Sequence, residues 1–252
     1  MGRRTSFKQK NDYFAFERGL SSIPNTHTAL SPLTLPASLI NMSFLKKLFN
    51  KTSQADPNFK TELLFQLYKE KIYPWVKVTF TDDDPNDISM QLKLTGDDSP
   101  IFINWLGDLA VFYVADTGEN FQILLERDLP IETSKEKLHQ LAVDNLNRDI
   151  EFKLHETNFG GYGLIAGGDH EAGVICLPEK WDWLTEHLND NLIVGIPSKD
   201  LVIVVPESDN DKVSNLKIFV HEIFKTGERL LTRNIFRFDR EGKKWTIVDR
   251  VN

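Results

Sequence analysis

Residues 158–181, NFGGYGLIAGGDHEAGVICLPEKW, place a glycine-rich stretch and the triplet Asp169-His170-Glu171 between two apolar runs. Such a segment could be a phosphate-binding loop, a metal site or a tight turn. The rest of the chain raises no chemical question as sharply, so the interpretation of this segment guides the prediction of the fold.

A phosphate-binding loop does not fit the surroundings of the glycines. Residues 161–166 match a loose G-x-G-x-x-A pattern, but a dinucleotide-binding fingerprint needs a helix directly after the glycines. Here the runs 161–166 and 172–177 both have the character of strands, and a helix begins only at Pro178. Glycines in the linking GGD supply the positive φ angles that a tight hairpin requires. The segment therefore predicts two strands joined by a turn.

A metal site is not predicted either. The three side chains of the Asp-His-Glu triplet alternate in direction if the chain is extended, and no second cluster at ligand spacing supports them. Residues 82–93 approach a calcium loop, but Asp87 stands where the loop needs glycine and Lys93 where it needs a bidentate Glu. We expect an acidic turn there, a surface turn at the triplet, and neither metal nor cofactor.

Hydrophobic periodicity extends the prediction outward. Capping residues and helical spacing predict helices over residues 56–72, 133–150, 178–188 and 210–227. Alternating or continuous apolar runs predict strands at 75–80, 88–96, 101–106, 151–157, 192–196, 201–205, 235–239 and 244–248. Hairpins interspersed with helices indicate an α+β fold with antiparallel or mixed sheets.

Residues 108–129 are compatible with two structures. Asp108 could cap a short helix that Gly118 breaks, or Thr117-Gly118 could close a β-hairpin. Two short helices are the preferred interpretation.

Composition limits the classes of function. The chain has 252 residues, of which 40% are apolar, and a net charge of −7. A core of useful size can form, whereas binding to nucleic acid or to an anionic membrane surface is not expected. Cys176 is the only cysteine, which excludes an intramolecular disulfide and agrees with a cytoplasmic protein.

The N-terminal part differs from the rest. Residues 1–41 carry five basic and two acidic residues and then become rich in Ser, Thr and Pro without periodicity. We expect a disordered leader or an extension before a true start at Met42, an amphipathic lead-in over 42–55, and a single α+β domain over 56–252. No run reaches the roughly 18 apolar residues of a membrane span.

Candidate nucleophiles have simpler interpretations. Cys176 lies in an apolar run where a thiolate is disfavoured. Ser198 and Asp200 could face a pocket, but a tight turn selects the same residue types.

Trp181 and Trp183 point roughly 200° apart on their helix, so Trp183 is expected to be partly exposed when Trp181 is buried.

Three segments, GGDHEAGVICLPEKWDWL, LIVGIPSKDLVIVV and LAVDNLNR, resemble the YtpQ-like family, a bacterial cytosolic domain of unknown function. The resemblance spans about residues 57–248. It implies no activity that can be transferred. The family-like positions are Ala142, Asn145, Leu146, Glu171, Pro197, Ser198 and Asp200.

These observations favour a non-catalytic binding or protein-interaction module with a protein partner and no catalytic residues. Its candidate binding surface comprises Asp169, His170, Glu171, Trp183, Ser198 and Asp200. The alternative is a hydrolase-like enzyme in which the turns at 167–171 and 197–200 converge on one polar site.

Overall fold

The computed structural model describes residues 21–22, 57–79 and 96–252. Two antiparallel sheets and their helices make up this part of the chain, which confirms the α+β prediction. The strand expected at 88–96 and the acidic turn at 82–93 lie wholly or almost wholly outside the described residues. So do the lead-in at 42–55 and all of residues 1–41 except Ser21 and Ser22.

The larger sheet has the strand order β1-β6-β7-β9-β8-β10-β11, and every neighbouring pair is antiparallel. Its strands are β1 (Ser21–Ser22), β6 (Lys153–Glu156), β7 (Tyr162–Ile165), β8 (Leu192–Ser198), β9 (Leu201–Pro206), β10 (Asn234–Asp239) and β11 (Lys244–Arg250). The short β1 is the part of the N-terminal segment that the structure describes, and it pairs with β6.

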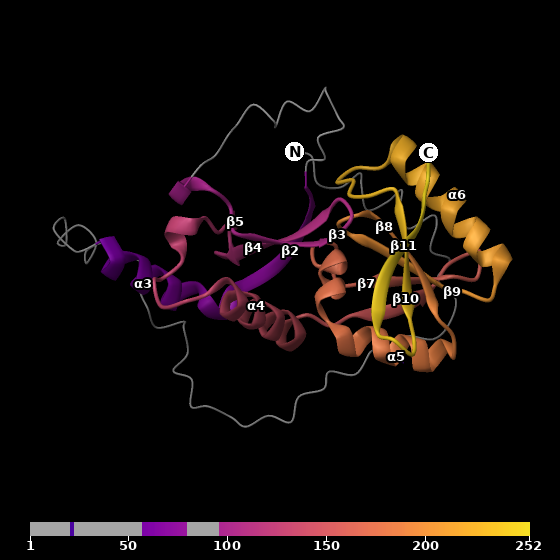
Figure 1. Ribbon diagram of the computed structural model, residues 1–252, viewed down its shortest axis with the longest axis horizontal. Coiled ribbons are helices and arrows are strands. Elements are labelled where there is room, and N and C mark those ends of the chain that lie inside the picture. Colours follow the sequence, from indigo (N-terminus) through magenta and orange to yellow (C-terminus); the bar gives the residue numbers. More distant parts are fainter. Residues whose placement is uncertain (1–20, 23–56, 80–95) are drawn as a thin grey trace.

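Both faces of the larger sheet are covered, which explains why β8 and β9 are continuous apolar runs. Helix α6 (Asn210–Thr226) packs on one face, against a cluster that includes Ile193, Ile203 and Ile235. Helix α5 (Pro178–Leu188) and the short helix η6 (Glu171–Cys176) belong to the opposite face. Figure 1 shows α5 and α6 on opposite sides of this sheet.

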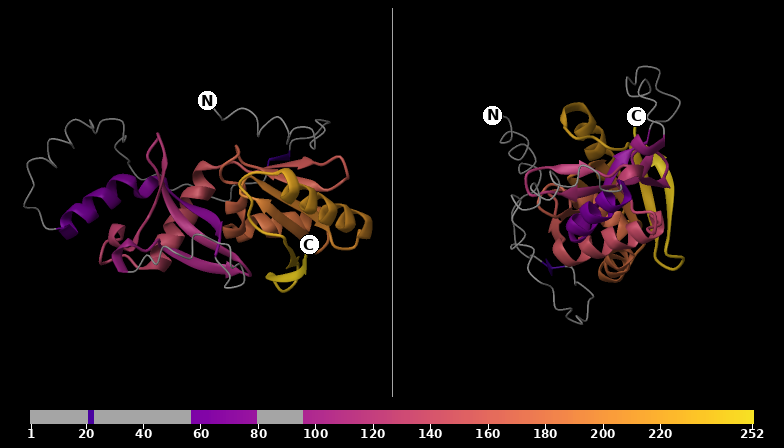
Figure 2. Two further views of the ribbon diagram at one scale, coloured as in Figure 1. Left: turned by 90° about the horizontal axis from the view of Figure 1, so that it is seen from above. Right: turned by 90° about the vertical axis from the view of Figure 1, so that its left-hand side faces the viewer.

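The smaller sheet has the order β2-β4-β3, and β5 pairs with β4. Its strands are β2 (Ile72–Val78), β3 (Phe102–Leu106), β4 (Leu109–Asp116) and β5 (Phe121–Ile123). Helices α3 (Pro57–Tyr68) and α4 (Lys135–Asp149) lie on the same side of the molecule as this sheet (Figures 1 and 2). Single 3-10 turns occur at η2 (Lys69–Lys71), η4 (Gly96–Asp98) and η5 (Glu126–Asp128).

The preferred interpretation of residues 108–129 was wrong, and the hairpin alternative is correct. Strands β4 and β5 pair across a turn in which Thr117 N donates to Asn120 O at 3.0 Å. Gly118 has a φ of 83°, and its N–H donates to Asp116 Oδ1 at 2.8 Å. The run LAVFYVA is rich in β-branched and aromatic residues, and its burial as a central strand outweighs the cap signal at Asp108.

The strand predicted at residues 172–177 was also wrong, because the chain forms η6 there. Gly167 and Gly168 do adopt the positive φ angles expected of a turn, 86° and 98°. After the turn, however, Glu171 is held beneath it and the chain coils instead of returning along β7. Strand β7 therefore pairs with β9 on that side.

The two sheets meet at an aromatic cluster. Trp105 of β3 lies 5.2 Å from Phe236 and 5.1 Å from Trp245, measured between ring centroids. Trp181 of α5 is fully buried, contacts Trp245, and donates from Nε1 to Val174 O at 2.8 Å. Within the smaller sheet's layer, Asn145 ties α4 to η2 and β2, because its Nδ2 donates to Lys69 O and Ile72 O at 2.7 and 2.9 Å.

Substitution Gly195→Ala tests the packing of α6 on the larger sheet. A Cβ at position 195 would lie 2.9 Å from Val220 Cγ2 and 3.4 Å from Leu216 Cδ2. We expect the free energy of unfolding to fall by about 1–3 kcal/mol, since the helix must shift to make room. Urea denaturation measures this change. An unaltered midpoint and slope would contradict the close approach of α6 to β8.

Candidate functional site

The turns at 167–171 and 197–200 lie side by side and are joined by Arg229. Its Nη2 donates to Asp169 Oδ1 at 2.5 Å, and its Nη1 donates to Gly168 O at 2.7 Å. The same Nη1 lies 3.4 Å from Asp200 Oδ2. Sequence reasoning did not identify Arg229, because nothing in its local pattern places it beside these two turns.

Ser198 is fully buried, and its hydroxyl donates to Asp200 Oδ1 at 2.7 Å. A further link between the turns runs from Ala172 N to Lys199 O, at 3.1 Å. The convergence that the hydrolase hypothesis needs is therefore present. The Ser198 hydroxyl in it is bonded to Asp200, and Arg229 contacts both the Asp169 and the Asp200 carboxylates, which is an arrangement that fixes two turns.

Glu171 is 1% exposed and supports the first turn from below. Its Oε1 accepts from Ala166 N at 2.9 Å and from Gly168 N at 2.6 Å, whereas Oε2 has no hydrogen-bond partner. Burial raises the pKa of this carboxyl above its ordinary value, although the backbone hydrogen bonds oppose the rise. The residue predicted to lie on the surface is thus an internal acceptor for the backbone of the turn.

His170 occupies a box of aromatic rings. The centroids of Tyr73, Trp75 and Phe121 lie 5.1, 6.0 and 5.7 Å from that of the imidazole. Nδ1 of His170 is buried without a hydrogen-bond partner. Burial lowers the pKa of His170, against the opposing effect of the Asp169 and Asp116 charges. The neutral imidazole therefore serves as a packing group between the two sheets.

Trp183 is separate from these turns. Its ring stacks on His187 with centroids 4.8 Å apart and an interplanar angle of 9°. The side chain is half-buried and packs against the main core. The structure thus brings together five of the six candidate residues and leaves Trp183 on α5 as a neighbour of the core.

Replacement of His170 by Phe should reduce the sensitivity of the fold to acid. The unfolded imidazole gains a proton near its ordinary pKa of 6.5, whereas the buried one does so only at lower pH. The wild-type free energy of unfolding therefore falls as pH drops below 6.5, and the Phe variant lacks this loss.

The measurement is chemical denaturation of both proteins between pH 7.5 and 5. Glu171 and His139 remain in both, so the difference between the two pH profiles isolates position 170. Parallel profiles would contradict a buried neutral His170.

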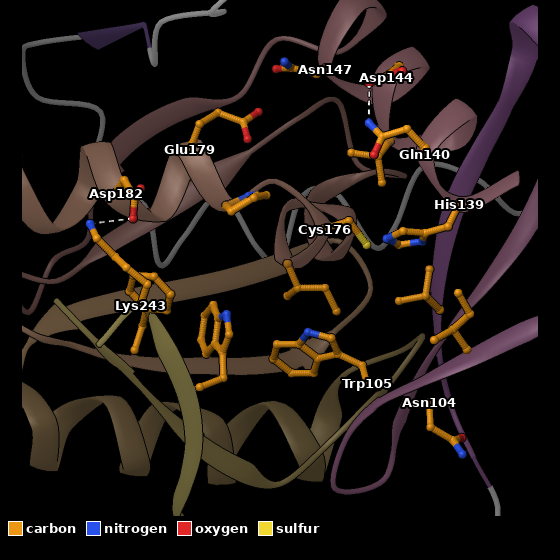
Figure 3. A pocket seen from close by; sticks show the side chains of 17 residues that line it. Asn104, Trp105, His139, Gln140, Asp144, Asn147, Cys176, Glu179, Asp182 and Lys243 are labelled. Carbon is orange, nitrogen blue, oxygen red and sulfur yellow. Dashed lines mark hydrogen bonds and ion pairs between the residues drawn. The ribbon is translucent and has the colours of Figure 1, made fainter. Parts of the chain in front are cut away.

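A groove of about 630 Å³ lies elsewhere, between α4, α5, β3 and the β10–β11 hairpin (Figure 3). One face of α4 lines it with residues at helical spacing, and these include Gln140, Val143, Asp144 and Asn147. The facing wall is formed by the end of η6 and the start of α5: Ile175, Cys176, Pro178, Glu179 and Asp182. The remaining lining comes from the two sheets and the side of α4: Ile103, Asn104, Trp105, Val111, His139, Phe238, Lys243 and Trp245.

The groove has an apolar side and an acidic side. Figure 3 shows Trp105 on one side, with Glu179, Asn147 and Asp144 along the other. Asp144 accepts from Gln140 Nε2 at 2.8 Å, and Asp182 pairs with Lys243 at 2.7 Å. Within the described residues Glu179 forms no salt bridge within 4 Å, although the adjacent Lys180 interacts with it electrostatically. Among the residues that line the groove, three carboxylates accompany one ammonium group, that of Lys243.

Asn147 is the most informative residue of the groove. It is 6% exposed, and its Oδ1 is buried with no hydrogen-bond partner. Buried polar atoms are almost always satisfied, because leaving a donor or acceptor unpaired costs about 1–3 kcal/mol. An unpaired acceptor in the lining of a groove points to a ligand that brings a donor.

The titratable groups of the groove do not form an activated nucleophile. Tyr113 Oη lies 3.1 Å from His139 Nδ1, and Figure 3 shows His139 and Cys176 directed into the same part of the groove. Burial raises the pKa of the Cys176 thiol to about 12 and lowers the pKa of His139. Both groups are therefore neutral at pH 7, and a reactive thiolate is not formed.

The described part of the chain contains no group of three or more His, Cys, Asp or Glu side chains that could hold a metal ion. Within the same ranges, no helix is both long and apolar enough to cross a bilayer.

Comparison of the chain with family models, curated proteins and solved structures gives no match. The geometry of the groove and of the turns therefore carries the functional interpretation.

Replacement of Asn147 by Leu should leave the free protein as stable as wild type or make it more stable. Leu has a similar volume, and it removes an acceptor that is buried without a partner. We expect the free energy of unfolding to rise by up to about 1 kcal/mol, measured by thermal and urea denaturation. A loss of 2 kcal/mol or more would show that Asn147 has a structural role and would remove it from the site.

Proposed function

We propose that this chain is a non-catalytic protein-interaction module that holds a segment of a partner protein in the groove between α4 and α5. One observation carries the proposal: the groove of about 630 Å³ joins an aromatic side to an acidic side that contains the unpaired Asn147 Oδ1. Buried aromatic anchors and a polar rim are the usual composition of an interaction site.

The charge of the protein supports a protein partner over nucleic acid. The net charge is −7, and the rim of the groove carries three acids against one base, Lys243. Phosphate groups would be repelled by such a rim. With Cys176 as the only cysteine, we propose a cytoplasmic location. We also propose membership in the YtpQ-like family, supported by the residues that carry the resemblance.

The hydrolase-like alternative is supported by one observation, the convergence of the turns at 167–171 and 197–200. It requires the buried Ser198 hydroxyl to leave Asp200 and meet a substrate and a general base. The binding proposal requires no such rearrangement.

An affinity pull-down from native cytosol tests the proposed function with four proteins: wild type, Gln140→Trp, Ile218→Trp and Trp183→Ala. Gln140 is exposed on α4 and lines the groove, so Trp at this position would obstruct it. Ile218 is 60% exposed on α6, on the other side of the larger sheet, and provides the matched control.

We expect a partner that wild type, Ile218→Trp and Trp183→Ala retain and that Gln140→Trp loses at least tenfold. Equal retention by all four proteins would place the interaction outside the groove. If no partner is retained and a broad hydrolase screen shows turnover that Ser198→Ala abolishes, the alternative is correct.

A further inference from the structure

We propose that the groove recognises an arginine side chain on a basic segment of the partner protein. This inference rests on the proposed function and specifies the chemistry of the partner. It follows from the distribution of charge, acceptors and aromatic rings in the groove.

The acidic side of the groove carries several hydrogen-bond acceptors. Among the described residues, Asp144 accepts from the neutral Gln140 amide, and Glu179 forms no salt bridge within 4 Å, although the adjacent Lys180 interacts with it electrostatically. Asn147 contributes an unpaired buried oxygen. In Figure 3 these three side chains lie on the same side of the groove, with Asn147 between the two carboxylates in that view. A guanidinium group carries five N–H donors in a planar fork, which suits several acceptors at once.

The aromatic side of the groove suits the stem and the planar head of an arginine side chain. Trp105 and Trp245 line the groove with their ring centroids 5.1 Å apart and their planes at 67°. The apolar stem of an arginine side chain can pack on these rings, and a guanidinium is attracted to an indole face. A lysine ammonium is more strongly hydrated and lacks the planar fork, so we expect it to bind more weakly.

The groove already contains one cationic side chain, that of Lys243. Lys243 lies in the β10–β11 turn and pairs with Asp182 at 2.7 Å. This ion pair places the lining ammonium group on Asp182, and in the described residues Asp144 and Glu179 form no salt bridge within 4 Å. Removal of the Lys243 charge should make the groove more attractive to a basic segment.

The test is fluorescence anisotropy of the full chain with labelled nine-residue peptides that carry three arginines, three lysines or three citrullines. Citrulline has the shape of arginine without its charge. The variants are Glu179→Gln, Asn147→Leu, Lys243→Asn and the control Glu186→Gln. Glu186 is an exposed acid on the same helix that does not line the groove. Asn suits position 243, because Lys243 has a φ of 50°.

We expect the arginine peptide to bind at least about tenfold more tightly than the citrulline peptide, with the lysine peptide between them. Glu179→Gln and Asn147→Leu should each weaken binding about fivefold or more, Lys243→Asn should strengthen it, and Glu186→Gln should leave it unchanged. Opposite effects at positions 179 and 243 would not arise from general unfolding.

Equal binding of the arginine and citrulline peptides would overturn the inference, and so would equal losses in Glu179→Gln and Glu186→Gln. If N-acetylarginine amide binds as tightly as the peptide, the ligand is a small organic cation and a protein segment is ruled out. If a groove-dependent partner is captured but the arginine peptide neither binds nor displaces it, the inference fails while the proposed function stands.

Discussion

The burial of β8 and β9 on both faces is the constraint on which the rest of the structure depends. Consecutive residues of these strands are inaccessible to water, from Leu192 to Ser198 and from Leu201 to Val205. Each face of the sheet therefore needs an apolar cover. Helix α6 supplies one cover, whereas the other is assembled from η6, α5 and the smaller sheet. The groove lies where the parts of this composite layer meet.

The buried carboxylate of Glu171 determines where that second layer begins. It accepts hydrogen bonds from the glycine-containing turn and lies under it, so the chain cannot continue as a strand beside β7. The coil of η6 then brings Val174 O to the Trp181 indole and starts α5 against the aromatic cluster. The polar residues of the two turns thus act at a distance from the groove, by fixing the elements that form one of its walls.

The polar side chains of the two turns and those of the groove have different roles. In the turns, hydroxyl, carboxylate and guanidinium groups are bonded to one another through Arg229, Asp200 and Ser198. The groove instead combines acidic residues, aromatic rings and the buried Asn147 oxygen, which has no hydrogen-bond partner in the described part of the chain. The turns also contain two unpaired buried atoms, Glu171 Oε2 and His170 Nδ1, but these lie under the turn and among aromatic rings. The groove supports a binding function better than the turns do, because its cavity of about 630 Å³ can hold a segment of a partner.

Local periodicity and caps such as Ser134 were enough to predict the α+β class, the main helices and most strands, because these signals act over a few residues. The sequence could not decide residues 108–129 or 172–177, where short apolar runs suit several structures until their neighbours are known. It identified residues of the turns, since glycine and acidic residues mark turns locally. The groove was decided only by the tertiary structure, because Asn147, Glu179 and Trp105 are ordinary residues of separate elements, and their common environment arises only when two sheets pack together.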